Sequence, residues 1–153
     1  MGIFSFFKQK HFFTPEEEQK ITDAIRNAET RTSGEVRIFI ESRCKFVDPL
    51  DRAMEIFFGL KMDQTKERNA VLVYIAVKDH QLAVFGDQGI HEKTGMDFWR
   101  HEVDLMVSDF NKSNYAEGLV KVVNEIGDAL HTHFPYDRAV DKNELPDNIV
   151  FGK

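Results

Sequence analysis

Three acidic residues stand where predicted strands and helices begin or end, and they are the first candidates for chemistry in this sequence. Glu35 directly precedes a predicted strand, Asp87 follows another, and Asp97 opens a predicted helix. Carboxylates that converge from separate loops bind hard cations, because Ca²⁺ takes roughly six to eight oxygen ligands from side chains, backbone carbonyls and water. The arrangement therefore indicates a divalent-cation site, with calcium as the expected ion.

Asp87 lies in a glycine-bracketed stretch, Gly86-Asp87-Gln88-Gly89, that admits two interpretations. Gly86 and Gly89 allow the backbone to approach an ion closely. The same stretch is also ordinary turn chemistry, and Asp97 can simply cap its helix. Spacing alone leaves both interpretations open, since the Asp-x-Asp-x-Asp-Gly pattern of an EF-hand is absent from the sequence.

Well-known catalytic motifs are also absent. The sequence has no Gly-rich loop ending in Gly-Lys-Ser/Thr, no Gly-x-Ser-x-Gly and no His-Glu-x-x-His. His101-Glu102 lacks the second histidine four residues after the first, and the histidines are expected at the surface or at helix ends. Cys44 follows a predicted strand and nothing near it marks a nucleophile, which indicates an inert thiol. No catalytic nucleophile is therefore identified.

The elements that must position the acids follow from hydrophobic periodicity. A helix begins at Thr14-Pro15-Glu16-Glu17, which combines a capping threonine, a proline in the first turn and a glutamate three residues after the cap. Alternating apolar residues over 36–40 predict a strand. The nearly continuous apolar run 70–77 predicts a central strand covered on both faces. A turn over 78–81 and a strand over 82–85 complete a hairpin with it.

The order of the elements predicts the fold. Further helices are expected from Pro49 to Gly59, from Asp97 to Phe110 and from Asn114 to Pro135. The whole chain then predicts an α/β fold, a three-layer α/β/α sandwich with a small mixed sheet that includes a β-hairpin. In that topology the first two strands are parallel and the third runs back, so Glu35 and Asp87 lie at the same end of the sheet.

Composition bounds the class of protein. The chain has 153 residues, the size of one domain, with 42% hydrophobic and 30% charged residues. Its formal net charge of −6 argues against nucleic-acid binding, which needs a basic surface. Cys44 is the single cysteine, so no internal disulfide can form, and no run reaches transmembrane length. The expected location is the cytoplasm.

The two ends of the chain differ from its centre. Residues 1–13 are rich in phenylalanine, residues 14–135 hold the predicted α/β domain, and residues 136–153 form a polar tail. The first segment lacks the apolar core and cleavage site of a signal peptide. Its phenylalanines favour a docked or frayed terminus, with a weak membrane contact or a protein contact as the alternative.

Several motifs, in order, resemble those of the TPM domain family, small α/β domains of thylakoid-lumen, bacterial and animal proteins. The resemblance covers roughly residues 13–134 and rests on Phe13-Thr14-Pro15-Glu16-Glu17, Ser33-Gly34-Glu35-Val36, Arg68-Asn69, Gly86 to Gly89, Asp97, and Tyr115-Ala116-Glu117-Gly118-Leu119. It implies an α/β/α sandwich with an acidic pocket at a loop edge that binds divalent cations, mainly calcium. Many relatives carry a signal peptide and a transmembrane helix, and neither is recognised in this sequence. A membrane-tethered role therefore does not follow from the resemblance.

By position, the resemblance implies Glu35, Asp87 and Asp97 as the pocket carboxylates, with Asn69 as a polar support. Arg68 is the cation expected near the acidic loop. Some plant members are described as acid phosphatases, so a metal-dependent phosphomonoester hydrolase is the alternative function, and a protein-interaction module is a third. Cation binding is preferred, because hydrolysis also needs a nucleophile or an oriented water and donors for the phosphoryl charge.

Overall fold

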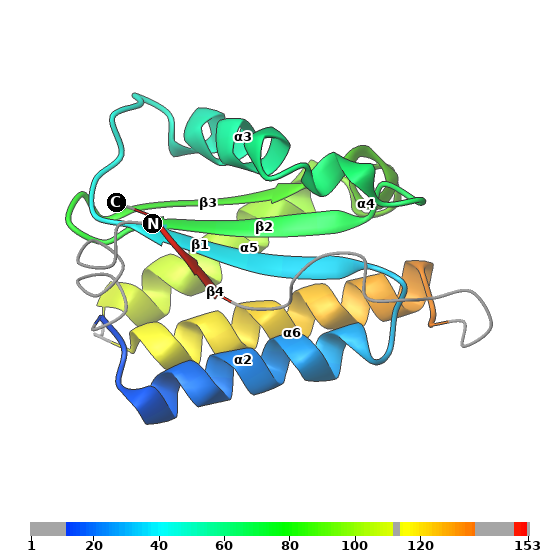
Figure 1. Cartoon of the computed structure of the whole chain (residues 1–153), viewed down its shortest axis with the longest axis horizontal. Helices are drawn as coiled ribbons and strands as arrows, with labels where there is room; N and C mark the ends of the chain where they lie inside the picture. Colours follow the sequence, from blue (N-terminus) through cyan, green and yellow to red (C-terminus); the bar gives the residue numbers. More distant parts are fainter. Residues whose placement is uncertain (1–11, 112–113, 137–148, 153) are drawn as a thin grey trace.

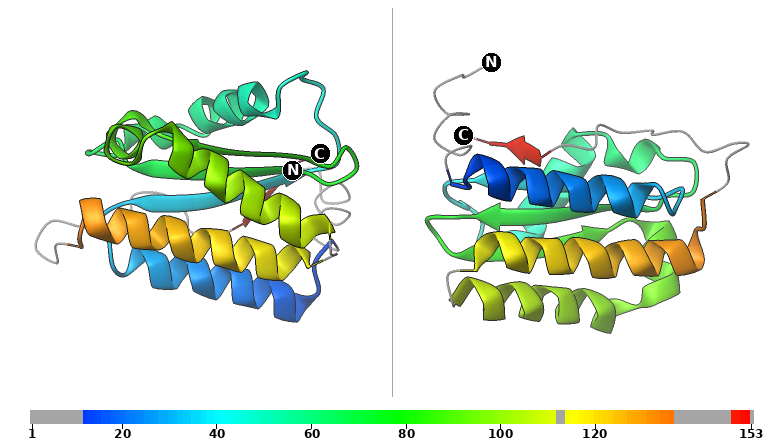
Figure 2. Two further views of the ribbon diagram at one scale, coloured as in Figure 1. Left: turned by 180° about the vertical axis from the view of Figure 1, so that it is seen from behind. Right: turned by 90° about the horizontal axis from the view of Figure 1, so that it is seen from below.

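The molecule is built as three layers, which Figure 1 shows from the side. The computed structural model describes residues 12–111, 114–136 and 149–152. A four-stranded mixed sheet in the order β3-β2-β1-β4 forms the middle layer. Helix α3 (Pro49–Gly59) covers one face, and α2 (Pro15–Glu29), α5 (Met96–Asn111) and α6 (Tyr115–His133) cover the other (Figures 1 and 2). The predicted α/β sandwich is confirmed.

The three central strands pair as the sequence predicts. Strands β1 (Glu35–Glu41) and β2 (Ala70–Ala76) are parallel, and β3 (Gln81–Gly86) returns antiparallel to β2 as a hairpin. A fourth strand, β4 (Ile149–Phe151), runs parallel to β1 opposite residues 38–40. The sequence predicts only a polar tail here, because a strand of three residues is too short to display an apolar periodicity.

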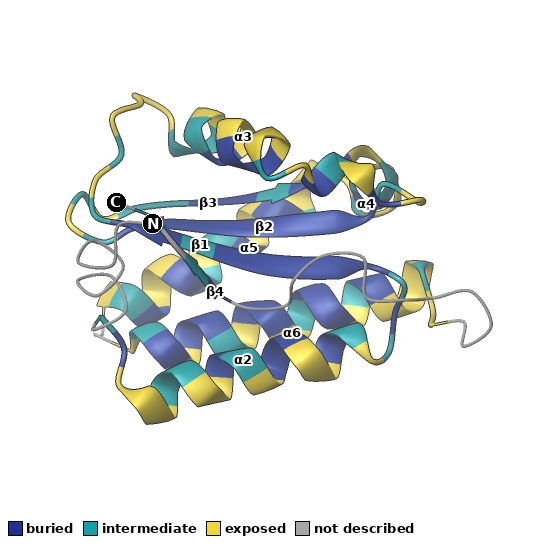
Figure 3. Ribbon diagram, in the orientation of Figure 1, coloured by how far each residue is buried: buried dark blue, intermediate teal, exposed yellow. Residues whose placement is uncertain are grey.

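Strand β2 lies at the centre of the core, and all seven of its residues are buried (Figure 3). Alternate side chains face opposite layers. Val71 and Val73 pack in the cluster that includes α2 and α6, whereas Leu72 and Tyr74 pack in the cluster that includes α3. A strand covered on both faces needs apolar residues at every position, which explains the continuous run in the sequence.

The helix starts agree with the predicted boundaries, and the predicted capping box of α2 is formed. In α2 the Thr14 hydroxyl accepts from the Glu17 amide at 3.1 Å, and the Glu17 carboxylate accepts from the Thr14 amide at 2.9 Å, so the capping box forms. Helix α6 begins after Asn114 as expected, but the Asn114 side chain makes no capping hydrogen bond. A short 3₁₀ helix, η1 (Met62–Gln64), and a short helix, α4 (Gln88–Thr94), complete the described elements.

Parts of both predicted terminal segments pack on the domain. Phe13 is 3% exposed, and the ring of Phe12 lies edge-on to that of Tyr115 with a centroid distance of 5.0 Å. The predicted membrane or partner contact of the first residues falls on 1–11, which lie outside the described residues, as do 137–148 and 153. Among the described helices, none has both the length and the apolar composition needed to cross a bilayer.

A buried ionic network fastens α3 to the sheet. The Glu41 carboxylate, at the end of β1, accepts from Arg52 Nε at 2.9 Å and from Arg52 Nη2 at 2.8 Å. It also accepts from the Tyr74 hydroxyl of β2. Burial and then the hydrogen bond to Glu41 raise the pKa of Tyr74, and the same carboxylate raises the pKa of Arg52 by hydrogen bonding. These shifts keep Tyr74 neutral and Arg52 charged, as the network requires.

Removing either partner of Glu41 is expected to destabilise the fold. Tyr74→Phe deletes a hydrogen bond to a buried carboxylate, a loss of about 1–3 kcal/mol in the free energy of unfolding. Arg52→Met leaves Glu41 without its cation and is expected to cost more. Urea denaturation measures both losses. Arg43→Met breaks the exposed pair with Asp79 and is the control, expected to change stability by less than about 1 kcal/mol. A control-sized loss in Tyr74→Phe would contradict the structural role of the network.

Candidate functional site

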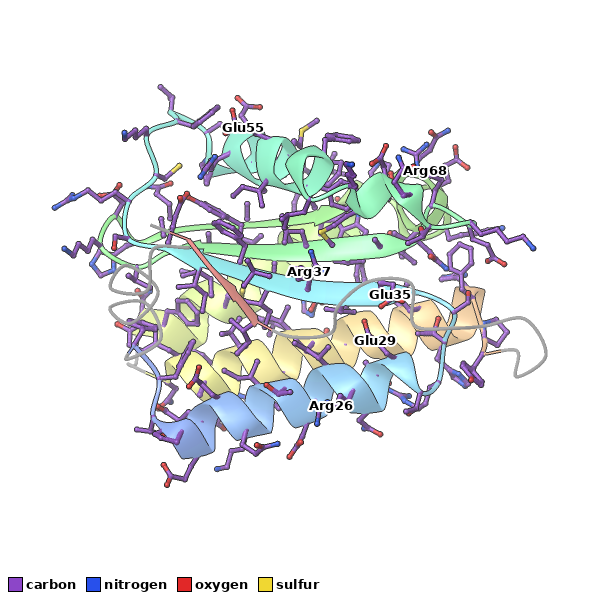
Figure 4. All side chains as sticks on the ribbon, in the orientation of Figure 1. Arg26, Glu29, Glu35, Arg37, Glu55 and Arg68 are labelled. Carbon is purple, nitrogen blue, oxygen red and sulfur yellow. The ribbon has the colours of Figure 1, made fainter. Side chains whose placement is uncertain are left out.

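The register of the sheet places Glu35 and Asp87 at the same end, on either side of Ala70. Glu35 lies opposite Ala70 in the β1–β2 pair, and the Asp87 amide donates to the Ala70 carbonyl at 2.9 Å. With neighbouring strands about 4.8 Å apart, the Cα atoms of the two acids are roughly 10 Å from each other. Figure 4 shows Glu35 and Arg68 toward this end of the molecule. The predicted placement is observed, and cation binding by these residues stays a prediction.

The Asp87 carboxylate is already surrounded by donors. It accepts from Arg68 Nε at 2.7 Å and from Arg68 Nη2 at 2.8 Å, and also from the Gln88 amide at 2.8 Å. Asp87 is the N-cap of α4, and its side chain is 2% exposed. The hydrogen bonds to Asp87 raise the pKa of Arg68. A cation at this carboxylate would therefore have to displace a charged guanidinium.

The glycine-bracketed stretch is a strand–helix junction, whereas the sequence predicts a loop. Asp87 caps α4, and Gln88 and Gly89 already belong to that helix. Both glycines are required by close packing: a Cβ on Gly86 would lie 2.2 Å from the Trp99 ring, and one on Gly89 would lie 2.1 Å from the Glu67 carbonyl oxygen. These contacts explain the two glycines without an ion.

Asp97 differs from the other two acids in its exposure. It sits in the first turn of α5, as predicted, but its side chain is 98% exposed and pairs with Arg100 at 3.5 Å on the same helix. Glu35 and Asp87, by contrast, are 2% and 1% exposed. The structure therefore brings Glu35 and Asp87 to one end of the sheet and leaves Asp97 at the surface.

Asn69 connects the starts of β1 and β2. Its carbonyl accepts from the Glu35 amide at 3.4 Å, its amide donates to the Thr65 hydroxyl at 3.2 Å, and its Nδ2 donates to the Ser33 hydroxyl at 3.1 Å. The side-chain oxygen, Asn69 Oδ1, is buried and has no hydrogen-bond donor among the described residues. A buried amide oxygen without a donor is costly unless another group satisfies it.

Two further charged residues at this end are missing from the sequence prediction. Glu29, the last residue of α2, accepts from the Val36 amide at 2.9 Å. Arg37 is 5% exposed; burial lowers its pKa, and the negative charges of Glu35 and Glu29 oppose that effect. Figure 4 labels these three side chains where α2 and β1 meet. The available signal was an arginine between Val36 and Ile38 of a predicted strand, because a charge that is buried there needs acidic partners.

A buried acid that the prediction also misses lies between α5 and α6. Glu102 is fully buried, and neither carboxylate oxygen has a hydrogen-bond donor among the described residues. Burial, followed by the hydrogen bond and the charge of Glu125, raises the pKa of Glu102 to about 9. Glu102 is therefore protonated at neutral pH. The signal was its position on the buried stripe between Trp99 and Met106.

Removing the Asp87 carboxylate is expected to destabilise the β3–α4 junction. Asp87→Ala loses the N-cap of α4, which alone costs about 1 kcal/mol, and leaves Arg68 without its acid. Asp87→Asn keeps an acceptor for the Gln88 amide and is expected to cost less. Thermal or urea denaturation tests this order, with Asp97→Asn as an exposed control within about 0.5 kcal/mol of the wild type. Equal stability of Asp87→Ala and the control would contradict a structural role for this ion pair.

The stability of the wild-type protein is expected to fall as pH rises from about 5 to about 9. The ordinary pKa of a glutamate is 4.5, and that of folded Glu102 is about 9, so between these values the folded protein keeps a proton that the unfolded chain releases. Glu102→Gln has no carboxyl group to titrate, and its amide can donate to Glu125. The variant is therefore expected to lose the part of the pH dependence that comes from Glu102. Denaturation of the wild type and of Glu102→Gln at several pH values, with chelator present, gives the slope of the free energy of unfolding against pH for each protein. Glu117→Gln, an exposed control, should keep the wild-type slope; an unchanged slope in Glu102→Gln would disprove the raised pKa.

Comparisons with known proteins place this geometry in a family. The family model described as the TPM domain matches residues 6–129. The solution NMR structure of the BA42 protein from the psychrophilic bacterium Bizionia argentinensis is 42% identical, covers 92% of this chain and 96% of its own, and superposes with a TM-score of 0.84. No match is found among curated proteins. The predicted resemblance is confirmed, and the chain belongs to the TPM domain family.

Proposed function

We propose that this domain binds a divalent cation, calcium in the first place, at the end of the sheet where β1 and β2 begin. The proposal is carried by the buried Oδ1 of Asn69, which has no donor among the described residues, one residue away from the β1–β2 pair that contains Glu35. Carboxylate and amide oxygens are the ligands that calcium prefers. A bound cation would satisfy an oxygen that is otherwise left without a partner.

The proposed ligand set is narrower than the one that the sequence suggests. Glu35 and Asn69 are the proposed ligands. Asp87 is proposed as a support that holds Arg68 and α4 in place, because its oxygens already accept from Arg68. Asp97, at 98% exposure, is left out.

A hydrolase function has less support than cation binding. The Arg68 guanidinium could otherwise bind a phosphate, but it donates its hydrogen bonds to Asp87. The hydroxyl groups of Ser33 and Thr65 accept hydrogen bonds from Asn69. A metal-dependent phosphomonoesterase would need the cation and a free donor for the phosphoryl oxygens. Hydrolysis of a generic phosphomonoester that is lost in Asp87→Asn would favour the hydrolase.

A cytoplasmic location is also part of the proposal. It rests on the single cysteine, Cys44, which is free in the structure and suits a reducing compartment. Fractionation of cells that express the full chain tests it. The third function considered from the sequence, a protein-interaction module, depends on terminal residues that lie largely outside the described part.

Calcium titration of the full chain, followed by amide NMR, is the direct test of the proposed site. The amides of residues 33–36 and 68–70 are expected to shift. Glu35→Gln, which keeps the side-chain volume, should weaken calcium binding by about tenfold or more, a loss at least as large as that for a supporting residue. Asp97→Asn is the matched control and should bind calcium as the wild type does. No shift at residues 33–36 under saturating calcium would refute the proposal, and equal weakening by Asp97→Asn would refute the narrower ligand set.

A further inference from the structure

A second group of possible metal ligands lies on the outer layer of helices, away from the start of β1. His101 and Glu102 belong to α5 and Glu125 belongs to α6, two helices that lie side by side (Figure 2). One ligand atom from each side chain lies within 4.8 Å of the other two. His101 Nε2 is 3.3 Å from Glu125 Oε1. One nitrogen and two carboxylates therefore meet at one point of the helix interface.

Glu102 is the member of this group that helix packing does not explain. It is fully buried, both of its oxygens lack a donor among the described residues, and its neighbours in the group are a second acid and a histidine. The same helix pair shows how a buried acid is usually accommodated. Asp109 of α5 is 7% exposed, and the ammonium group of Lys121 on α6 lies 3.4 Å from its carboxylate. Glu102 occupies a comparable interface position, and no lysine or arginine of the described residues donates to it.

We propose that His101, Glu102 and Glu125 form a second cation site, which takes a zinc-like divalent metal in preference to calcium. An imidazole nitrogen suits borderline first-row metals, whereas calcium prefers oxygen ligands throughout. The site is separate from the proposed calcium site and does not depend on it. Binding of the metal displaces the proton of Glu102 and places a positive charge beside its carboxylate.

The spacing of one ligand pair fits such a metal. Zinc binds nitrogen and oxygen ligands at about 2.0–2.2 Å, which sets neighbouring ligand atoms roughly 3–4 Å apart. The pair of His101 Nε2 and Glu125 Oε1, at 3.3 Å, already has this spacing. The side chains of His101 and Glu125 are 59% and 42% exposed, so the site opens to solvent. Water can enter with the ion and fill the remaining coordination positions.

Zinc titration of the untagged full chain, first stripped with chelator, tests the site. Calorimetry is expected to show one equivalent bound, and NMR of the histidine rings should show His101 shifting at Nε2. His101→Gln and Glu102→Gln should each weaken binding by about tenfold or more, since even supporting residues of metal sites have effects of that size. His133→Gln and Glu117→Gln, at exposed positions of the same layer, are the matched controls and should bind as the wild type does.

Several outcomes would overturn the proposal. Zinc that shifts His133 and leaves His101 unmoved would place the ion elsewhere. Wild-type affinity in Glu102→Gln would mean that the buried acid only shares a proton with Glu125. Calcium that moves the His101 ring more than zinc does would contradict the metal class. The test of this site is independent of the test of the calcium site. Glu35→Gln is expected to leave zinc affinity unchanged, and a loss of zinc affinity in that variant would refute a separate site.

Discussion

Burial of β2 on both faces is the constraint on which the rest of the molecule depends. A strand whose seven residues are all buried cannot carry charge along its length, because an ion taken into an apolar interior loses its hydration. Charged side chains therefore collect where the strands begin and end. Glu35 and Asp87 flank Ala70 at one end, and Glu41 lies opposite Ala76 at the other. Packing thus creates two polar ends before any ligand is considered.

The buried acids of the described chain are distinguished by how they are compensated. Ion pairs join Asp87 to Arg68, Glu41 to Arg52, and Asp109 to Lys121. Compensation of this kind is what a buried carboxylate requires, and it indicates structure rather than binding. Glu102 and the Oδ1 of Asn69 depart from the pattern, because no donor satisfies them among the described residues. Unsatisfied oxygen atoms, more than the number of acids, mark the two proposed cation sites.

Local signals made much of the fold predictable from the sequence. The capping box of Thr14 and Glu17 and the apolar run of β2 each depend on neighbours in the chain, and both appear as expected. Features that depend on residues far apart in the chain could not be predicted from the sequence. The pairing of β4, the surface position of Asp97 and the burial of Glu102 against Glu125 are decided by packing between elements. The end of the sheet was therefore predictable, whereas the partners of its side chains were not.

The pairing of β4 with β1 joins the first strand of the sheet to the last. Contacts between segments so far apart in the chain form late, because a long loop must close first. Until residues 149–151 have been synthesised, the backbone of residues 38–40 borders the sheet without a neighbour, while Glu29 covers the amide of Val36. A nascent or truncated chain would thus present an open edge of the kind that recruits other strands. In the complete sheet, the short last strand covers residues 38–40 of β1 and becomes the edge strand in its place.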